Sequence, residues 1–372
     1  MRVLVNALSV TNLSGRHVLL GHLSKLAEWT NGQHDYFVLY HKANKDICKD
    51  LGKNVQWIEC PEYTTQWLTR ILWERTLLHR ILSKYKIDLL FNQSGTALTS
   101  FPVRQISYAM NPWCLVPEVE RKPFEEIKAY LQRKAYRQAM KNADIMLFLS
   151  EYMQKAYRKN AGFEEKASEV LYTAIDEETH NVAERYRKVI QKKPTQVLSV
   201  SVMAPHKGAE TVIRAVDILR RSHGISVRLI LIGSWPDGGY EKRIKALVEE
   251  FGLDQQIAFK GHVSQKELYR YYAESKIFCL MSWCESFGIP AVEAQAFGTP
   301  VISSNCCAIP EVCGDGGVYP DPGDFNTVAF QMARLLTDDN AWVRLSEAAI
   351  QNAAKYRWDI CSKPLMRIFE LN

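Results

Sequence analysis

Short apolar runs of strand length alternate with longer stretches of helical spacing along the first half of the chain. The run Val3–Val10 is followed by a small-residue loop, Thr11–Gly15, and by a helical pattern from about Arg16 to Trp29. A strand, a small-residue loop and a helix in this order open a doubly wound parallel sheet. Further strand candidates are Tyr36–Tyr40, Leu89–Phe91, Gln105–Tyr108 and Ile145–Leu149. The first half therefore predicts an α/β domain.

A second alternation of the same kind follows a basic, polar stretch over residues 185–194, which we interpret as a linker. Its strand candidates are Val197–Val202, Val227–Ile232, Ile257–Phe259, Ile277–Met281 and Val301–Ser304. Its helix candidates are Ala209–Arg221, Glu241–Phe251 and a helix that begins at Pro290. We predict an α/β protein with two Rossmann-like parallel-sheet domains, over residues 1–188 and 195–355. The last helical stretch, 342–372, contains a proline, so its end, 356–372, is a candidate to bend back onto the first domain.

Length and composition agree with two ordinary globular domains. The 372 residues are 47% hydrophobic and 24% charged, which argues against a disordered, collagen-like or disulfide-scaffold protein. The net charge of +6 is well short of a protein that coats nucleic acid, so we expect no nucleic-acid partner. Nine cysteines without a C-x-x-C pair suggest reduced thiols in a cytoplasmic compartment. The first ten residues do not resemble a secretory signal, and we expect no membrane span.

The segment from Glu285 to Glu293 carries the most informative chemistry. Glu285 ends a loop after a predicted strand, and Glu293 lies about one turn inside the next predicted helix. Between them, Phe287, Gly288 and Ile289 place backbone N–H groups at a helix N-terminus, which attracts a diphosphate. Two glutamates alone fit an acidic loop and a capped helix equally well.

Three other turns carry candidate binding residues. His206 and Lys207 follow a strand, and a lysine there can contact phosphate as a point charge. The turn at His262 and Val263 precedes a helix with a capping box, and its backbone can bond a flat base. The loop Ser14–Arg16 in the first domain is a candidate to face the phosphates. Each of these turns, taken alone, also fits an ordinary connection between a strand and a helix.

Taken together, these segments resemble glycosyltransferase family 4. The resemblance rests on the stretches 285–301, 309–312, Lys207–Gly208 and Leu231–Ser234, which occur in the family's order and spacing. It is strong over residues 197–325 and weaker over the first domain. The resemblance implies a GT-B fold, in which two facing Rossmann-like domains have the active site in the cleft. It also implies transfer of a sugar from a nucleotide diphosphate donor with retention of anomeric configuration.

The resemblance also implies roles for individual residues. Glu293 matches the glutamate that binds the ribose hydroxyls, and Glu285 matches the one beside the donor sugar. Lys207 matches the phosphate-binding lysine. The remaining matched positions of the nucleotide-sugar site are Ser14, Gly15, Arg16, His206, Gly233, His262, Val263, Leu268, Ser286, Phe287, Gly288 and Ile289. The implied catalytic set is Glu285, Lys207 and Asn111.

The chain departs from the family pattern at two charged positions. Ser201 and Val202 stand where the family has an arginine, and the hypothesis is that Arg16 or His206 supplies the missing positive charge. Asn111 stands where the family often has a histidine; an amide can hydrogen-bond a sugar but is no general base at neutral pH. No D-x-D triplet is present, so we expect metal-independent transfer with no cofactor besides the donor substrate.

Two stretches of the first domain suggest a membrane surface. The apolar residues of Gln66–Leu82 have helical spacing with arginines among them. A second stretch is dense in cations: Arg121, Lys122, Lys128, Arg133, Lys134, Arg137 and Lys141. Basic amphipathic surface suits a lipid-linked acceptor at an anionic membrane. The same residues fit two ordinary helices that cover the sheet with solvated basic faces.

The sequence therefore favours a retaining hexosyltransferase, with UDP-glucose as the narrowest donor hypothesis. The expected acceptor is a polysaccharide or a lipid-linked oligosaccharide in envelope or exopolysaccharide synthesis. The expected location is the cytoplasm, with peripheral contact at the inner face of the membrane. Two alternatives stay open: a catalytically inactive GT-B partner subunit and a GT-B sugar-nucleotide epimerase. A dinucleotide-dependent dehydrogenase is disfavoured, because no G-x-G-x-x-G opens either sheet.

Overall fold

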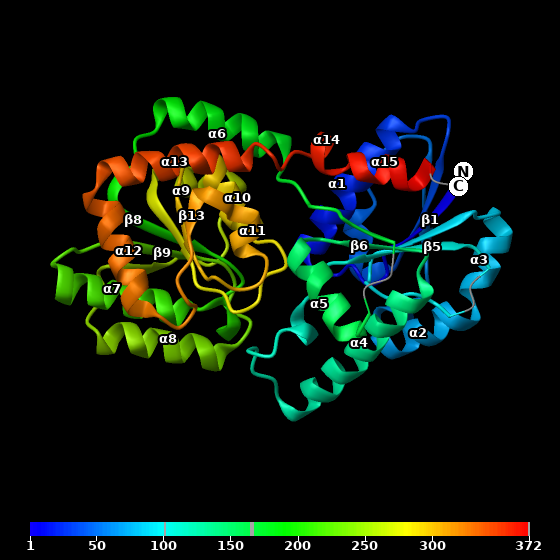
Figure 1. Ribbon diagram of the computed structural model, residues 1–372, viewed down its shortest axis with the longest axis horizontal. Helices are drawn as coiled ribbons and strands as arrows, with labels where there is room; N and C mark the ends of the chain where they lie inside the picture. Colours follow the sequence, from blue (N-terminus) through cyan, green and yellow to red (C-terminus); the bar gives the residue numbers. More distant parts are fainter. Residues whose placement is uncertain (100–101, 164–166, 371–372) are drawn as a thin grey trace. The chain divides into compact units, whose positions relative to one another are not determined.

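The computed structural model describes residues 1–99, 102–163 and 167–370, which divide into two compact units. Unit 1 comprises residues 1–117, 121–174 and the C-terminal segment from Trp358, and unit 2 comprises 118–120 and 175–357. Each unit contains one parallel sheet covered by helices (Figure 1). We describe the two units separately.

Unit 1 contains seven parallel strands in the order β3-β2-β1-β4-β5-β6-β7. They are β1 (Arg2–Asn6), β2 (Asp35–Tyr40), β3 (Val55–Glu59), β4 (Leu89–Asn92), β5 (Arg104–Ala109), β6 (Ile145–Phe148) and β7 (Ser168–Val170). The central strands β1, β4, β5 and β6 are buried along almost their whole length, because helices cover both faces of a parallel sheet. In β1, for example, Val3, Leu4 and Val5 are all buried.

The helices of unit 1 include a C-terminal pair that returns to the first helix of the chain. They are α1 (Leu13–Trp29), α2 (Trp67–Thr76), α3 (Leu78–Tyr85), α4 (Pro123–Asn142), α5 (Glu151–Ala161), α14 (Trp358–Cys361) and α15 (Lys363–Glu370). Trp358 lies against the ring of His22 on α1, with 5.1 Å between centroids. Ser362 Oγ is 2.9 Å from Nδ1 of the same histidine. Figure 1 shows this red segment beside the blue α1.

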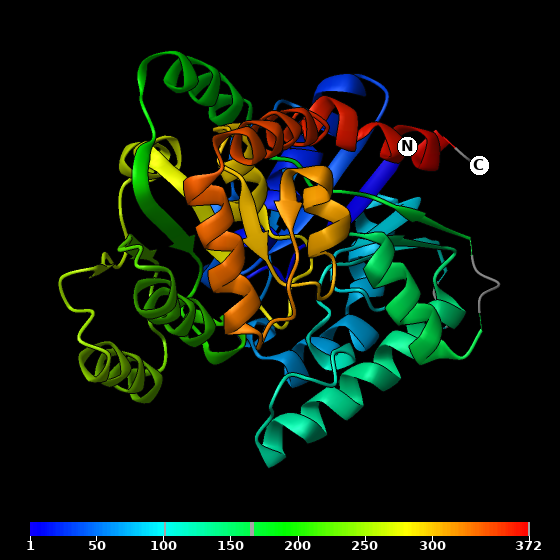
Figure 2. The ribbon, with the colours of Figure 1, turned by 60° about the vertical axis from the view of Figure 1, so that its left-hand side comes forward.

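Unit 2 contains six parallel strands in the order β10-β9-β8-β11-β12-β13. They are β8 (Lys193–Val200), β9 (Arg228–Ile232), β10 (Ile257–Phe259), β11 (Ser275–Leu280), β12 (Val301–Ser303) and β13 (Gly317–Val318). Its helices are α6 (Glu177–Val189), α7 (Ala209–His223), α8 (Gly238–Glu250), α9 (Gln265–Glu274), α10 (Ile289–Ala296), α11 (Ile309–Cys313), α12 (Phe325–Thr337) and α13 (Asp339–Ala353). Figure 2 shows helices on both faces of this sheet.

In both sheets the strand order reverses beside the first strand of the unit. The reversal lies between β1 and β4 in unit 1 and between β8 and β11 in unit 2. Connections from the two central strands leave toward opposite faces there, which opens a crevice at their carboxyl ends where ligands bind in this architecture. The two reversals are therefore the first places to examine for function.

Some sequence-based predictions of elements were wrong. The linker predicted over 185–194 is instead the end of α6 and the start of β8. Charge density suggested a linker, but α6 is amphipathic, with Val182 and Ala183 on its buried face. The helical stretch predicted over 342–372 does bend as expected: it breaks after α13, and α14 and α15 pack on unit 1. Three edge strands, β3, β7 and β13, were not predicted, because edge strands are short or half-exposed and lack a continuous apolar run.

No helix in the described part of the chain is long and apolar enough to cross a membrane.

Candidate functional site

A lysine and a glutamate form an ion pair at the strand-order reversal of unit 2. Lys207 ends the short 3-10 helix Pro205–Lys207 after β8, and Glu285 lies in the loop after β11. The Lys207 Nζ lies 2.6 Å from Glu285 Oε1, and it also donates to the Cys284 carbonyl at 3.4 Å. Both side chains are less than one-fifth exposed, at 17% and 13%. The pair thus presents one cation and one carboxylate where the sheet topology predicts a ligand.

The loop that carries Glu285 continues through Ser286 directly into helix α10. No side-chain hydrogen bond caps the N-terminus of this helix. Pro290 has no N–H, and the Ala291 and Val292 amides donate to the Gly288 carbonyl. The Ile289 amide and the positive end of the dipole are therefore left for an anion. Gly288 holds the turn with a φ of 91°, and a β-carbon there would lie 2.6 Å from Ile309 Cδ1. Phe287 is buried against the ring of Tyr356, at a centroid distance of 5.1 Å. These contacts fix the backbone of residues 287–289 at the helix start.

Glu293 lies inside α10 and is half-buried beside a tyrosine from α9. The Tyr272 hydroxyl donates to Glu293 Oε2 at 2.8 Å. Burial raises the pKa of Glu293 to about 7, the Tyr272 hydrogen bond opposes this shift, and the charge of Asp176 adds to it. This carboxyl group therefore titrates near neutral pH, where it can change between donating and accepting a hydrogen bond.

His206, the neighbour of Lys207, does not supply a positive charge at neutral pH. Burial and the adjacent Lys207 lower the pKa of His206 to about 4. Its backbone carbonyl accepts from Trp283 N–H at 2.8 Å, which ties the loop after β8 to the loop after β11. We assign His206 a role in joining the two loops.

Gly233 is confined by a neighbouring backbone. It has a φ of 141°, and a β-carbon at this position would lie 1.7 Å from the Ser201 carbonyl oxygen. Its amide donates to the Gly261 carbonyl at 2.9 Å. The ends of β8, β9 and β10 come so close together here that only a residue without a side chain fits at position 233.

The residues predicted to contact the base lie at the start of α9. His262 is exposed, whereas Val263 and Leu268 are half-buried. Ser264 caps α9 and forms a capping box with Glu267, as the S-x-x-E spacing predicts. The exposed turn can contact a ligand. The capping box already provides hydrogen-bond partners for the amides at the start of α9.

The remaining predicted residues belong to unit 1. Ser14, Gly15 and Arg16 form the first turn of α1, not a loop, and the Gly15 amide donates to the Asn12 side chain at 2.7 Å. Arg16 pairs with Asp46 at 2.7 Å. Asn111 is exposed after β5, and its side-chain oxygen accepts from Trp113 N–H at 3.0 Å. Internal partners therefore already engage Gly15, Arg16 and Asn111.

Unit 2 thus gathers one group of predicted residues around two neighbouring loops. Lys207 and Glu285 touch, and the segment from Ser286 to Glu293 follows in the same loop and helix. Ser14, Gly15, Arg16 and Asn111 lie on the other unit.

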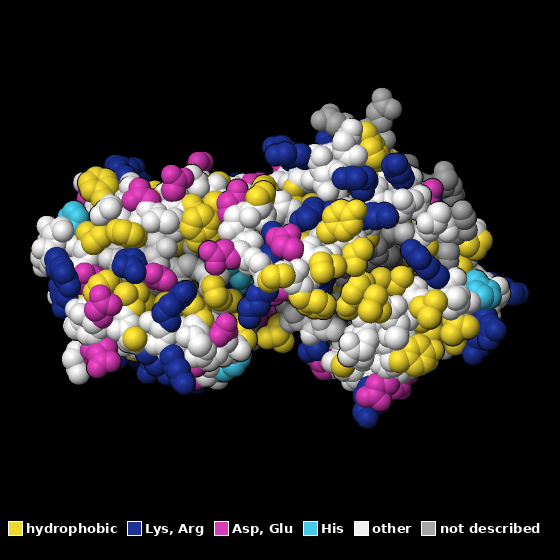
Figure 3. All heavy atoms as spheres, turned by 90° about the horizontal axis from the view of Figure 1, so that it is seen from below, with side chains coloured by type: hydrophobic (Ala, Val, Ile, Leu, Met, Phe, Trp, Pro, Cys, Tyr) yellow, Lys and Arg dark blue, Asp and Glu magenta, His cyan; other side chains and the backbone are white. Residues whose placement is uncertain are grey.

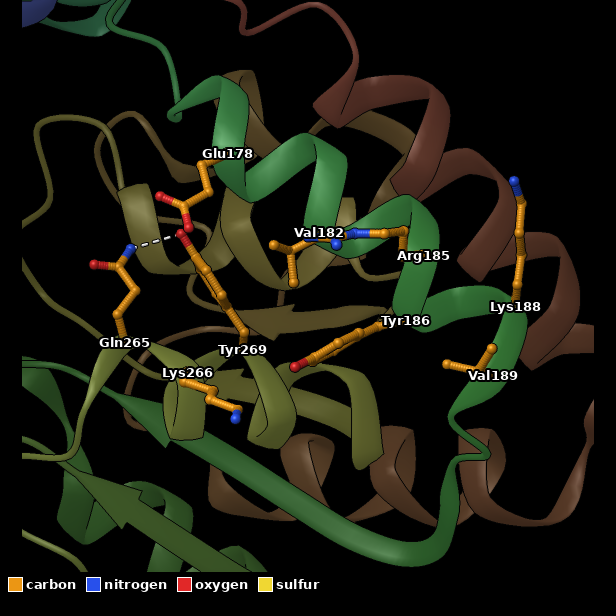
Figure 4. Close-up of a pocket in the computed structure, with 9 residues that line it drawn as sticks. All are labelled: Glu178, Val182, Arg185, Tyr186, Lys188, Val189, Gln265, Lys266 and Tyr269. Carbon is orange, nitrogen blue, oxygen red and sulfur yellow. Dashed lines mark hydrogen bonds between the residues drawn. The ribbon is translucent and has the colours of Figure 1, made fainter.

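A hollow of unit 2 lies elsewhere, between α6 and α9. It has a volume of about 770 Å³. Figure 4 shows its lining residues, with Tyr186 and Tyr269 between the two helices and a hydrogen bond from Gln265 to Tyr269. None of the predicted site residues lines it. Because it lacks the Lys207–Glu285 pair and the α10 N-terminus, we place the candidate site at the strand-order reversal.

Sequence reasoning missed two residues that support this site. Tyr272 supplies the hydrogen bond to Glu293, and only its helical register in α9 could have suggested that it faces inward. Lys192 donates to the Tyr272 carbonyl at 3.2 Å, to the Phe297 carbonyl at 3.1 Å and to the Thr299 hydroxyl, close to the C-terminal end of α10. These bonds tie the end of α9 to the end of α10, and burial lowers the pKa of Lys192 to about 7. The sequence placed Lys192 in a linker and so gave no sign of this role.

A family model matches the C-terminal half of the chain. The family model described as glycosyl transferases group 1 matches residues 182–355, a little under half of the chain. The C-terminal half of the chain is similar to group 1 glycosyl transferases. The matched range contains Lys207, Glu285 and Glu293, together with the whole sheet of unit 2.

Curated relatives match over the same half. The O-antigen chain mannosyltransferase B of Escherichia coli is 29% identical over 177 residues, which cover 47% of this chain and 45% of the relative. The D-inositol 3-phosphate glycosyltransferase of Corynebacterium jeikeium is 32% identical over 169 residues, which cover 44% and 40%. The matched segment thus spans less than half of either relative. These likenesses support the GT-B glycosyltransferase superfamily.

Solved structures are similar over the whole chain. Anabaena HepE in complex with UDP and glucose has a TM-score of 0.74 and 18% identity, with all of both chains covered. Sucrose-phosphate synthase from Thermosynechococcus elongatus has a TM-score of 0.78 and 19% identity, with 99% of this chain and 98% of that one covered. The two likenesses show the GT-B fold, as predicted: two Rossmann-like parallel-sheet domains.

Proposed function

We propose that the protein is a retaining glycosyltransferase that transfers a hexose from a nucleotide diphosphate donor. The observation that carries the proposal is the Lys207–Glu285 pair at the strand-order reversal of unit 2, beside the uncapped N-terminus of α10. A diphosphate needs both a fixed cation and a free amide, and this place supplies them together. The similarity of residues 182–355 to group 1 glycosyl transferases supports the same assignment.

The chemistry follows from the charge that develops on the leaving group. The bond between the anomeric carbon of the sugar and the diphosphate oxygen breaks, and the nucleotide diphosphate departs with the electron pair. Lys207 and the N-terminus of α10 stabilise that negative charge, while the sugar gains oxocarbenium character. The acceptor hydroxyl forms the new bond on the same face of the sugar and passes its proton to the departing diphosphate oxygen. Glu285 orients the sugar hydroxyls and holds Lys207 in place.

The donor we propose is a UDP-hexose, and UDP-glucose is the specific hypothesis. Glu293 would accept hydrogen bonds from the ribose hydroxyls, and the turn at His262 and Val263 would contact the base. Two relatives carry mannosyltransferase names, and Anabaena HepE was solved with UDP and glucose. All of these concern hexoses, which supports the sugar class proposed for this chain.

The acceptor we propose is a saccharide or a lipid-linked saccharide used in envelope or exopolysaccharide synthesis. The name of the Escherichia coli relative refers to an O-antigen chain, which supports a polymer acceptor. We further propose that the protein works in the cytoplasm, with peripheral contact at the inner face of the membrane. The protein's own cations, in place of a metal ion, would neutralise the diphosphate.

A thermal-shift screen tests the donor site first. Purified protein is mixed with UDP, GDP, dTDP, ADP and their hexose conjugates, with and without a chelator. A ligand at 100 times its dissociation constant adds about 2.7 kcal/mol of stability. We expect one base to raise the melting temperature, an effect lost in Lys207→Ala and Glu293→Ala and kept in the surface control Lys242→Ala.

Product analysis with the bound donor then separates the alternatives. Slow release of free hexose from donor alone, and transfer when a saccharide is added, support the transferase. A new sugar nucleotide would instead indicate an epimerase. Binding without any turnover would indicate an inactive partner subunit, and no binding of any nucleotide would overturn the site assignment.

A further inference from the structure

Two helices of unit 1 turn apolar side chains toward solvent. Half of the fourteen exposed large hydrophobic side chains among the described residues belong to α2 and α4. On α2 they are Leu68, Ile71 and Leu72, and on α4 they are Phe124, Ile127, Tyr130 and Leu131. Single exposed hydrophobic residues are ordinary, but a concentration on two helices marks an interaction surface.

The apolar stripe of α4 lies opposite its buried face. Ile127 follows Phe124 by three residues and Leu131 follows Ile127 by four, so the three side chains share one side of the helix. Their exposed fractions are 74%, 61% and 43%. The core-facing residues of α4, by contrast, are Ala129, Tyr136, Ala139 and Met140. The exposed stripe is not needed to pack α4 on unit 1, because the buried residues on the other side of the helix make that contact.

Helix α2 repeats the arrangement. Leu68, Ile71, Leu72 and Arg75 have the spacing of a single helix face, and all four are exposed. Trp73 is the side chain that anchors α2 to the core. Both ribbon views place α2 and α4 next to each other on the same side of unit 1 (Figures 1 and 2). We call the two outward stripes together the α2–α4 face.

The charge around this face is positive. Residues 121–142 contain seven Lys and Arg against two Glu. Both glutamates have partners around the N-terminal half of α4, because Glu125 accepts from the Lys122 amide and Glu126 pairs with Arg121 and Arg133. Lys128 and Lys134 are exposed beside the apolar stripe. Figure 3 shows yellow hydrophobic side chains gathered on the right-hand half of the molecule, with dark blue Lys and Arg among them.

We propose that the α2–α4 face docks on the surface of an anionic lipid bilayer. Apolar side chains on a helix that lies flat can enter the boundary between headgroups and acyl chains, while Lys and Arg beside them contact anionic headgroups. Tyrosine is suited to the same boundary, because its ring is apolar and its hydroxyl is polar. The face has both features and no unengaged acidic residue in 121–142. The proposal deepens the peripheral contact proposed above and needs no assumption about donor or acceptor.

Vesicle flotation of the full chain tests the docking without nucleotide. We expect binding to vesicles of phosphatidylcholine mixed with phosphatidylglycerol, and much weaker binding to phosphatidylcholine alone. The double variant Phe124→Ser/Ile127→Ser should bind the mixed vesicles about tenfold more weakly or worse. The control is Phe330→Ser/Val343→Ser, which removes two exposed apolar side chains from unit 2 (54% and 44% exposed) and should bind as the parent does.

A charge-reversal pair tests the electrostatic part. Lys128→Glu/Lys134→Glu should weaken binding to the mixed vesicles about tenfold or more, whereas Lys242→Glu/Lys260→Glu, with the same change in net charge, should have little effect. Equal binding to both vesicle types, or equal loss in the control pairs, would overturn the proposal. So would a dimer in solution that Phe124→Ser/Ile127→Ser dissociates, because the face would then join two copies. Nucleotide thermal shifts on the same variants show whether the donor site is intact, so the two proposals fail separately.

Discussion

The two sheets order their strands alike but carry different chemistry where the order reverses. In unit 2 the ends of β8 and β11 hold Lys207 and Glu285, a charged pair beside an uncapped helix N-terminus. In unit 1 the ends of β1 and β4 hold Asn6 and Asn92, which are opposite each other in the strand register, and Asn12 caps the following helix. The same topology thus creates a crevice twice, with different side chains at the strand ends, and we propose the diphosphate site at the unit 2 reversal.

Glu74 reinforces the contrast at the unit 1 reversal. It accepts from the Asn6 side chain at 2.7 Å, and burial raises its pKa. The Gln93 side chain nearby is buried, and both of its polar atoms lack a hydrogen-bond partner in the structure. Arg70 lies beside this carboxyl group, and its charge opposes the rise of the Glu74 pKa. Its guanidinium donates to the Leu8 carbonyl at 3.0 Å, so this cation is engaged inside unit 1. The comparison teaches that fold alone locates the crevices, while the side chains at the strand ends select the ligand.

Removing the cation of unit 2 should have the largest effect. Lys207→Ala takes away the charge that stabilises the leaving diphosphate, and we expect kcat to fall by about 10² to 10³. The matching change at the other reversal, Asn92→Ala, should leave nucleotide affinity unchanged. Steady-state kinetics with the donor from the thermal-shift screen, together with melting temperatures, measures both. If Asn92→Ala lowered nucleotide affinity and kcat as much as Lys207→Ala, the two strand-order reversals would not differ in function.

Gly233→Ala should cause the largest loss of stability. Its new methyl group would lie 1.7 Å from the Ser201 carbonyl in a strained backbone conformation, so the free energy of unfolding should fall by about 3 kcal/mol. Gly238→Ala, at an open helical position, serves as the control and should be neutral or stabilising. Urea denaturation measures both. If Gly233→Ala keeps its stability but loses donor binding, this glycine contacts the ligand instead.

The pH dependence of donor binding should report Glu293. Its pKa of about 7 in the folded protein means that it is protonated at lower pH and accepts ribose hydrogen bonds poorly. The association constant should therefore rise with pH up to about 7 and fall about tenfold per unit below it. Tyr272→Phe removes a donor to the carboxylate, so the midpoint should move to higher pH.

The same pKa shift predicts the opposite trend for stability without ligand. The folded state holds the Glu293 proton more tightly than the unfolded state, whose pKa is near 4.5. This contribution to the free energy of unfolding is present below the unfolded pKa and is lost as pH rises through about 7. Titration of the melting temperature with and without nucleotide checks the two signs. Glu293→Gln should abolish both dependences.

The smallest effect is expected at the helix N-terminus of unit 1. Asn12→Ala removes the side chain that accepts from the Gly15 amide, and we expect a loss of about 1 kcal/mol of stability. Nucleotide affinity should stay unchanged, because the Gly15 amide is engaged by the cap and not by a ligand. Denaturation and thermal shift with nucleotide measure the two quantities. A gain in affinity would mean that the freed amide binds phosphate and would weaken the contrast between the units.

The sequence by itself determined the two parallel-sheet domains and the composition of the unit 2 site. Strands β8 to β12 are apolar along most of their length because both faces are covered, so their runs can be seen without a structure. The spacing between Glu285 and Glu293 and the capping box at Ser264 are local, and local patterns survive in a linear sequence. The edge strands β3, β7 and β13 were not predicted, because they are short or partly exposed. The end of α6 was not predicted, because its many charged residues resemble a linker.

Only the tertiary structure decided which side chains meet. Lys207 and Glu285 are 78 positions apart in the chain, and strand order brings them within 2.6 Å. Tyr272 reaches Glu293, and Arg16 turns to Asp46, through packing that no local pattern encodes. The outward stripes of α2 and α4 have the same periodicity as buried ones, so the sequence left their direction open. Burial, which depends on the rest of the fold, decides whether an amphipathic face points to the core or to solvent.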